Sequence, residues 1–130
     1  MTSLPTMSIP VDVADLAMAL EDFGAGYLLT VGAASTVKVV TVEPAVTDGV
    51  LLVTGPGKGT LANLAGNTAV TLVFPPPEPR GFTLLVDGTA EVAGDDVRLT
   101  PTGAVLHRPA SHADGPPAPG GCGHDCAPVA

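Results

Sequence analysis

The chain has 130 residues, which is enough for one domain with one hydrophobic core. Its formal net charge is −8 and it holds only five lysines and arginines, so nucleic acids and anionic membranes are unfavourable partners. No apolar run is long enough to span a bilayer, and residues 1–10 lack the basic and apolar regions of a signal peptide. We therefore expect a cytoplasmic location.

The composition predicts a core of small side chains. The chain has no Trp, one Tyr and three Phe, so Val, Leu and Ala must fill the interior. Such side chains bury less apolar surface than aromatic ones, and each Å² of that surface contributes roughly 25 cal/mol. The folded monomer should therefore be only slightly more stable than the unfolded chain, which favours dimerisation.

The first third of the chain predicts one helix followed by two strands. Apolar residues recur at helical spacing over 11–23, where Asp12 is a suitable N-cap and Gly24 a suitable end. Short apolar and β-branched runs predict strands over 27–31 and 37–42.

The remaining elements are mostly strands separated by turn signals. They are predicted at 50–54, 70–74, 82–86 and 89–92, with 97–99 extending the last hairpin and 105–108 ambiguous. Asp87-Gly88 is interpreted as the turn between two of them, and Thr60 as the N-cap of a short helix over 61–65. The short, hairpin-like connections favour a closed or partly closed antiparallel β-barrel.

Residues 109–130 form a Pro/Gly-rich tail outside the domain of residues 1–108. The tail has no apolar periodicity, so we expect it to be disordered or to lie across a partner subunit. Cys122, His124 and Cys126 lie close together in it and are residue types that bind zinc. A metal site, a reducible disulfide and no function at all stay open as alternatives.

The Gly-rich turn from Thr54 to Thr60 is the main candidate site. Its glycines expose backbone N–H groups, the following helix begins there with a partial positive charge, and Lys58 adds a full one. This combination suits a phosphate. The turn is not a Walker A loop, because Leu52 replaces the first glycine and Gly59 follows the lysine. The alternative is a flexible turn with a solvated lysine.

Lys38 is the second candidate, because it lies within an apolar strand where a charge is costly. It either converges with Lys58 on one ligand or is simply the outward-facing residue between Val37 and Val39.

Five segments carry the order of strands, turn and helix: GYLLTVG (26–32), VKVVTV (37–42), DGVLLVTGPGKGTLANLAGN (48–67), AVTLVF (69–74) and FTLLVDGTAEV (82–92). Together they resemble the FMN-binding split-barrel superfamily, the relatives of pyridoxamine 5′-phosphate oxidase. The resemblance covers roughly residues 12–108. It implies a mostly β fold: a split antiparallel barrel of six or more strands, with an N-terminal helix and a short helix after the third strand.

The resemblance also implies a homodimer with two FMN sites at the subunit interface. In this family a basic residue of the second strand and hydroxyl and basic residues after the third strand hold the phosphate. Many relatives place a lysine three residues before the helix Asn, which looks like Asn63; here that position is Thr60 and the lysine is at 58. The implied cofactor-binding residues are Lys38, Val39, Val40, Thr54, Gly55, Lys58, Gly59, Thr60 and Asn63.

Three hypotheses follow for the function. The first is an FMN- or deazaflavin-dependent oxidoreductase of unknown substrate. The second is a dimeric binding module for deazaflavin, haem or no cofactor, without catalysis, since the family includes such members. The third is metal binding through the Cys/His tail. No residue set resembles the pyridoxal-phosphate substrate site, so the oxidase reaction is not carried over.

Overall fold

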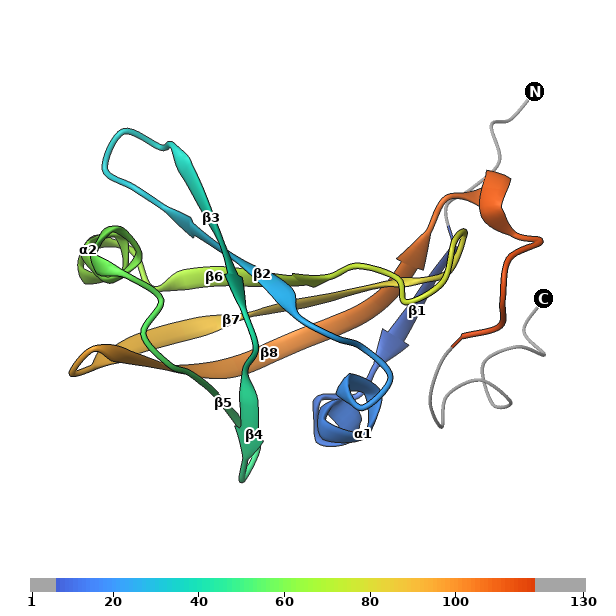
Figure 1. The fold of residues 1–130 in the computed structure, drawn as a ribbon, viewed down its shortest axis with the longest axis horizontal. Helices are drawn as coiled ribbons and strands as arrows, with labels where there is room; N and C mark the ends of the chain where they lie inside the picture. The colour runs from blue at the N-terminus through green and yellow to red at the C-terminus, as the bar shows by residue number, and fades with distance from the viewer. Residues whose placement is uncertain (1–6, 119–130) are drawn as a thin grey trace.

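The computed structural model describes residues 7–118, which form a strongly curved antiparallel sheet with two short helices (Figure 1). The strands are β1 (Met7–Val11), β2 (Gly26–Val31), β3 (Val37–Val42), β4 (Ala45–Thr47), β5 (Val50–Val53), β6 (Ala69–Phe74), β7 (Thr83–Ala93) and β8 (Asp96–Arg108). The helices are α1 (Leu16–Leu20) and α2 (Lys58–Gly66), and the 3₁₀ helices are η1 (Val13–Asp15) and η2 (Ala110–His112). No helix among these residues is long and apolar enough to cross a membrane.

The strand order makes the sheet a split barrel. Neighbouring strands follow the order β3-β2-β6-β7-β8-β5-β4, and β1 pairs with β8 beside this path. The two end strands, β3 and β4, are consecutive in the chain and joined only by Glu43 and Pro44. The sheet therefore curls until its first and last strands lie close together, which confirms the predicted mostly β, split-barrel fold.

The inner face of the curled sheet carries the core. Inward side chains on five strands are almost fully buried: Leu28, Leu51, Leu72, Phe74, Leu84, Val86, Leu99 and Leu106. As the composition predicts, aliphatic side chains dominate. Phe74 is the main aromatic contribution, and it packs against Phe23 with ring centroids 6.3 Å apart.

The predicted helix over 11–23 is wrong in extent. Val11 ends β1, which pairs with the last residues of β8, and the helical part is limited to η1 and the five residues of α1. Asp12 does cap this region, since its Oδ1 accepts a hydrogen bond of 3.1 Å from the N–H of Ala14. The pairing with β8 overrides the helical spacing at the start of this segment.

The predicted turn at Asp87-Gly88 is also wrong. β7 runs unbroken from Thr83 to Ala93, with a register shift against β8 at these two residues, so the predicted fifth and sixth strands are one. Gly88 is needed there, because a Cβ would lie 2.4 Å from the carbonyl oxygen of Thr100. The ambiguous residues 105–108 likewise belong to a single long strand, β8.

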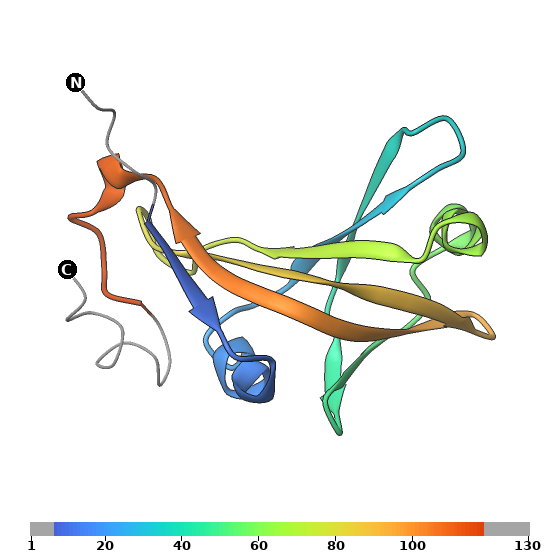
Figure 2. The same ribbon diagram turned by 180° about the vertical axis from the view of Figure 1, so that it is seen from behind.

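The described part of the predicted tail, residues 109–118, lies at the opposite end of the molecule from α2 (Figure 2). We call it the terminal segment. The buried guanidinium of Arg108 donates hydrogen bonds to the carbonyl oxygens of Ala113 and Pro116, at 3.4 and 2.6 Å. Arg80 pairs with Asp114 at 2.6 Å. These contacts hold the terminal segment against its own chain.

Candidate anion and cofactor site

The loop between β5 and α2 exposes the N-terminus of that helix. Gly55 and Gly57 have φ angles of 53° and 104°, in the left-handed region that favours glycine. α2 begins at Lys58, and no side chain caps its first turn. Unpaired N–H groups and the helix dipole give this end a partial positive charge, which favours anions.

Lys38 reaches from β3 to this helix start. A Cβ on Gly59 would lie 2.8 Å from Cε and 3.2 Å from Nζ of Lys38, so the lysine occupies the space that the missing side chain leaves. Lys38 lies opposite the buried Thr30 in the sheet register, on the face away from the exposed Val37 and Val39. Lys38 is itself exposed, but it does not share the face of Val37 and Val39.

Thr60 provides a buried hydroxyl group without a partner. Its residue is 0% exposed, and Oγ1 makes no hydrogen bond. The predicted role of Thr60 as a cap is wrong, because α2 begins two residues earlier, after Gly57. A buried hydroxyl left unsatisfied costs about 1–3 kcal/mol, so Oγ1 is an unused hydrogen-bonding group in the first turn of the helix.

Two lysines, Lys38 and Lys58, lie at this helix start without acidic ion-pair partners. Within residues 7–118 the ion pairs are Arg80–Asp114 and Arg98–Glu91, and neither involves Lys38 or Lys58. Two cations beside the positive end of a helix repel each other unless an anion lies between them. The electrostatics therefore favour a phosphate or a carboxylate group here.

Asn63 secures the helix to the sheet. Its Nδ2 donates a hydrogen bond of 3.1 Å to Oγ1 of Thr30 on β2. Its Oδ1 would lie 3.0 Å from a Cβ on Gly32, so a glycine permits the close approach of the two segments. Through this contact Asn63 fixes the position of the α2 start relative to β3.

Asp96, the first residue of β8, also binds this loop, and the sequence did not predict that contact. Its Oδ1 accepts a hydrogen bond of 2.9 Å from the N–H of Gly55. In the sequence, Gly94-Asp95-Asp96 has only the composition of a turn, which says nothing about a loop that is distant in the chain. The loop is thus tied to the β7–β8 hairpin.

Further along β3, a hollow of about 280 Å³ is lined by Thr41, Val42, Glu43 and Thr54. We call it the β3–β5 hollow, because its walls come from the ends of these two strands. Thr54 lies here, and Lys38 is not among the lining residues. The segments 38–43 and 54–60 therefore border both the helix start and the hollow.

The other predicted site residues lie as follows. Val40 is half-buried against the core, while Val39 is 53% exposed on the opposite face of β3. Residues 7–118 contain no cluster of potential metal ligands. Cys122, His124 and Cys126 lie outside the described residues, and their metal binding stays a prediction.

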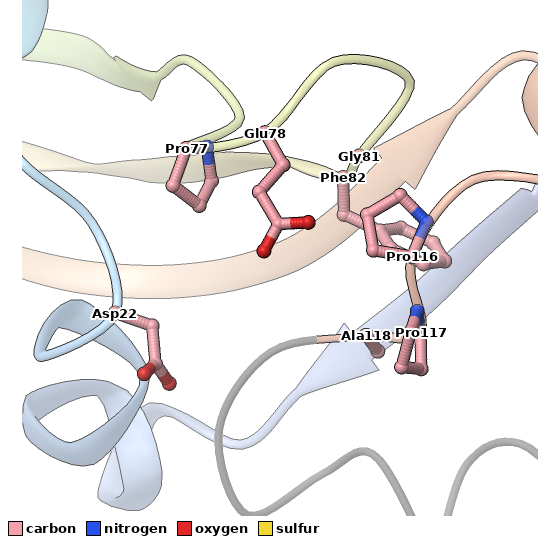
Figure 3. Close-up of a pocket in the computed structure, with 8 residues that line it drawn as sticks. All are labelled: Asp22, Pro77, Glu78, Gly81, Phe82, Pro116, Pro117 and Ala118. Atoms are coloured by element: carbon pink, nitrogen blue, oxygen red, sulfur yellow. The ribbon is translucent and has the colours of Figure 1, made fainter.

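A second hollow, of about 370 Å³, lies between the end of α1, the β6–β7 loop and the terminal segment (Figure 3). Its lining consists of Asp22, Pro77, Glu78, Gly81, Phe82, Pro116, Pro117 and Ala118. None of the residues predicted to bind a cofactor is among them.

No known protein-family profile matches the chain. The uncharacterized proteins Mb0449c of Mycobacterium bovis and MT0457 of Mycobacterium tuberculosis are each 39% identical to it over 135 residues. Each alignment covers 89% of this chain and 92% of the relative. The chain belongs to the same family as these two proteins.

Solved structures place this family within a known fold. The FAD binding protein of Mycobacterium smegmatis is 18% identical, with a TM-score of 0.59 over 78% of this chain and 98% of that chain. An F420 reductase is 20% identical, with a TM-score of 0.54 over 69% and 94% of the two chains. A Listeria innocua protein named for pyridoxamine 5′-phosphate oxidase is 13% identical, with a TM-score of 0.58 over 72% and 96%. These structures confirm the predicted split-barrel fold of this chain.

Proposed function

We propose that this protein binds a flavin, with FMN as the first candidate, and acts as a flavin-dependent oxidoreductase. The observation that carries the proposal is the group at the start of α2. Lys38 lies against Gly59, and the next residue, Thr60, has a buried Oγ1 without a hydrogen-bond partner. Structural neighbours named as a FAD binding protein and an F420 reductase support a flavin or deazaflavin over an unrelated anion.

The chain's own residues fit the phosphate end of such a cofactor. Lys38 and Lys58 supply charge, the first turn of α2 supplies N–H groups, and Thr60 supplies a hydroxyl group. Asn63 and Asp96 position this group through their contacts with Thr30 and Gly55. The bound flavin supplies the capacity to take up and release electrons. We also propose that the protein is cytoplasmic.

The test compares FMN with riboflavin, which lacks the phosphate. Titration followed by flavin fluorescence should show FMN binding at micromolar concentrations or below, and riboflavin binding far more weakly. Lys38→Ala should weaken FMN binding by about 10- to 100-fold, the range for one charge-assisted hydrogen bond, and leave riboflavin binding unchanged.

Arg98→Ala is the matched control, because it removes one positive charge from an exposed pair with Glu91 that takes no part in the contacts at the start of α2. It should not alter the preference for FMN. Equal affinity for FMN and riboflavin, or no binding of either, would exclude the phosphate site. The same titration with F420 distinguishes a deazaflavin protein from a flavin protein.

We further propose that the protein is a homodimer with the cofactor sites at the subunit interface. Tyr27, Val37 and Val39 are 41, 52 and 53% exposed and project from one face of β2 and β3. In the register Val39 lies opposite Leu29, so these side chains form a continuous face without charge. A second copy is its occupant, since copies with a net charge of −8 repel each other least through an uncharged apolar face.

Light scattering after size exclusion tests the dimer. Val39→Glu should convert it to a monomer, because two carboxylates would be buried across the two-fold axis. Val92→Glu is the control, since Val92 is also an exposed valine, at 43%, but lies on β7. A monomeric parent protein, or equal effects of the two changes, would contradict the assignment.

A further inference from the structure

Buried polar side chains are rare in this protein. Within residues 7–118 the buried polar or charged residues are Thr30, Thr60 and Arg108. Arg108 is accounted for by the carbonyl groups of the terminal segment. Thr30 on β2 and Thr60 in the first turn of α2 belong to the two elements that Asn63 joins. Since a buried hydroxyl group is costly without a partner, the presence of Thr30 calls for an explanation.

Packing alone does not explain a threonine at position 30. Its inward neighbours include Leu28 on the same strand and Val40, which pairs with Leu28 on β3. A valine has nearly the shape of threonine and would fill this place without burying a polar atom. Within the described residues, the side chain of Thr30 makes one hydrogen bond, which it accepts at 3.1 Å from Nδ2 of Asn63. The hydroxyl group therefore serves the contact with α2.

α2 rests on the hairpin of β2 and β3 at two points that are one helical turn apart. At the first point Asn63 binds Thr30, and its Oδ1 would lie only 3.0 Å from a Cβ on Gly32, just after β2. At the second point Lys38 of β3 lies against Gly59, where a Cβ would be 2.8 Å from its Cε. Thr30 and Lys38 are direct partners in the register of the two strands. Thr30 is therefore joined to the helix through Asn63 and to Lys38 through the sheet.

We propose that Thr30 is a positioning residue that sets the preference of the site for a flavin with a phosphate group. This inference rests on the proposed flavin site. Thr30 is 0% exposed, so it acts through Asn63 and Lys38. Its hydrogen bond fixes the first turn of α2 relative to the ammonium group of Lys38, so that both address the same phosphate. Charge-assisted hydrogen bonds weaken steeply with distance and angle, and a shifted helix start would lose them.

Three variants isolate the hydroxyl group. Thr30→Val removes it and keeps the shape of the side chain, and Thr30→Ser keeps it. Thr71→Val is the matched control, because Oγ1 of Thr71 on β6 donates a hydrogen bond of 2.7 Å to Asp87. The control also removes one side-chain hydrogen bond from a strand threonine, but this bond does not involve α2.

The first readout is the affinity for FMN and riboflavin beside the urea midpoint of the empty protein. Thr30→Val should bind FMN about fivefold more weakly and riboflavin as the parent does, and Thr30→Ser should restore most of the FMN affinity. The urea midpoint should change by less than about 0.5 M, because the lost bond is offset by a more apolar core and Asn63 is only half-buried. A general loss of stability would weaken the binding of both flavins together.

The second readout is hydrogen exchange of the side-chain amide of Asn63, followed by NMR without any flavin. In the parent protein this amide should be protected by its bond to Thr30. Thr30→Val should raise its exchange rate by about tenfold, while Thr30→Ser and Thr71→Val should leave it near that of the parent.

The outcomes separate this inference from the proposed function. A protected amide with equal FMN affinity in Thr30→Val and the parent, or an equal loss of affinity in Thr71→Val, would overturn the role of Thr30 and leave the flavin site standing. An unprotected amide in the parent would overturn the contact itself. No binding of FMN to the parent would overturn the flavin site and this role with it. The expected result is a selective loss of FMN affinity at nearly unchanged stability.

Discussion

Basic residues lie at the two ends of this molecule, and they are used in opposite ways. At the terminal segment, Arg108 is 5% exposed, lies over the ring of Phe82 at 4.1 Å and donates hydrogen bonds to backbone carbonyls. Arg80 binds the carboxylate of Asp114. At the start of α2, Lys38 and Lys58 have no ion-pair partner among residues 7–118.

The difference separates structural from ligand-binding charge in a chain with few cations. A guanidinium group that is stacked on a ring and donates to backbone carbonyls stabilises the fold, although one buried nitrogen of Arg108, Nε, has no partner. Lysines gathered at an uncapped helix start do not stabilise the folded chain by themselves, because each repels the other and the helix dipole. Variants at the two ends should therefore separate stability from ligand affinity.

The largest effect is expected from Arg108→Met, which keeps an unbranched side chain but removes every hydrogen bond. Loss of the charge-assisted bonds and of the contact with Phe82 should lower the free energy of unfolding by about 3 kcal/mol. Urea denaturation measures this value. Arg98→Met, at an exposed pair, should cost less than about 1 kcal/mol. Similar losses in both variants would contradict a structural role specific to Arg108.

Gly59→Ala should lower ligand affinity without lowering stability. The added Cβ would lie 2.8 Å from Cε of Lys38, so the flexible lysine must move away from the helix start. FMN affinity should fall by about tenfold, while the free energy of unfolding stays equal or rises by up to about 1 kcal/mol, because Ala favours a helix over Gly.

A double-mutant cycle sharpens this prediction. In a Lys38→Ala background, Gly59→Ala should cost little additional affinity, since the side chain that it displaces is already gone. Additive losses from the two substitutions would show that Gly59 acts through backbone approach to the ligand, independently of Lys38.

The sequence predicts the order of the elements and the location of the site because both rest on local patterns. The Gly-rich turn, the short helix after it and the strand with Lys38 can each be found from neighbouring residues. The site hypothesis required Lys38 and Lys58 to converge on one ligand. The contact at Gly59 brings Lys38 to the residue after Lys58, and the shared ligand stays a prediction.

The errors come from contacts between distant parts of the chain. β1 exists because Met7 to Val11 pair with Ala104 to Arg108, and no local pattern reports that partner. Asp87-Gly88 resembles a turn, but the backbone of Thr100 makes it an irregularity within one strand. The bond from Asp96 to Gly55 was missed for the same reason.

Asp96 offers a smaller and more selective test of the α2 end. Asp96→Asn keeps an oxygen that can accept the N–H of Gly55 and removes a negative charge near the proposed phosphate, so FMN affinity should hold or rise by up to about threefold. Asp96→Ala loses the bond, and the loosened loop should bind FMN about fivefold more weakly. Equal affinities in the two variants would show that the bond does not position the loop.

The smallest effect is expected at Asp114, on the surface of the terminal segment. The hydrogen bond from Arg80, assisted by the positive charges of Arg80 and His112, holds the pKa of this carboxyl group below its ordinary value. A lowered pKa means that the contact contributes stability above the unfolded-state value of about 4, and that this contribution is lost as the pH falls through the lowered pKa. Carboxyl-carbon NMR should show Asp114 titrating below the ordinary value of about 4 for an aspartate. In Arg80→Gln the pKa of Asp114 should return toward the ordinary value, because the cationic donor is gone.

An unchanged titration in that variant would mean that the ion pair does not hold the terminal segment in solution. The contrast between the two ends would then rest on Arg108 alone.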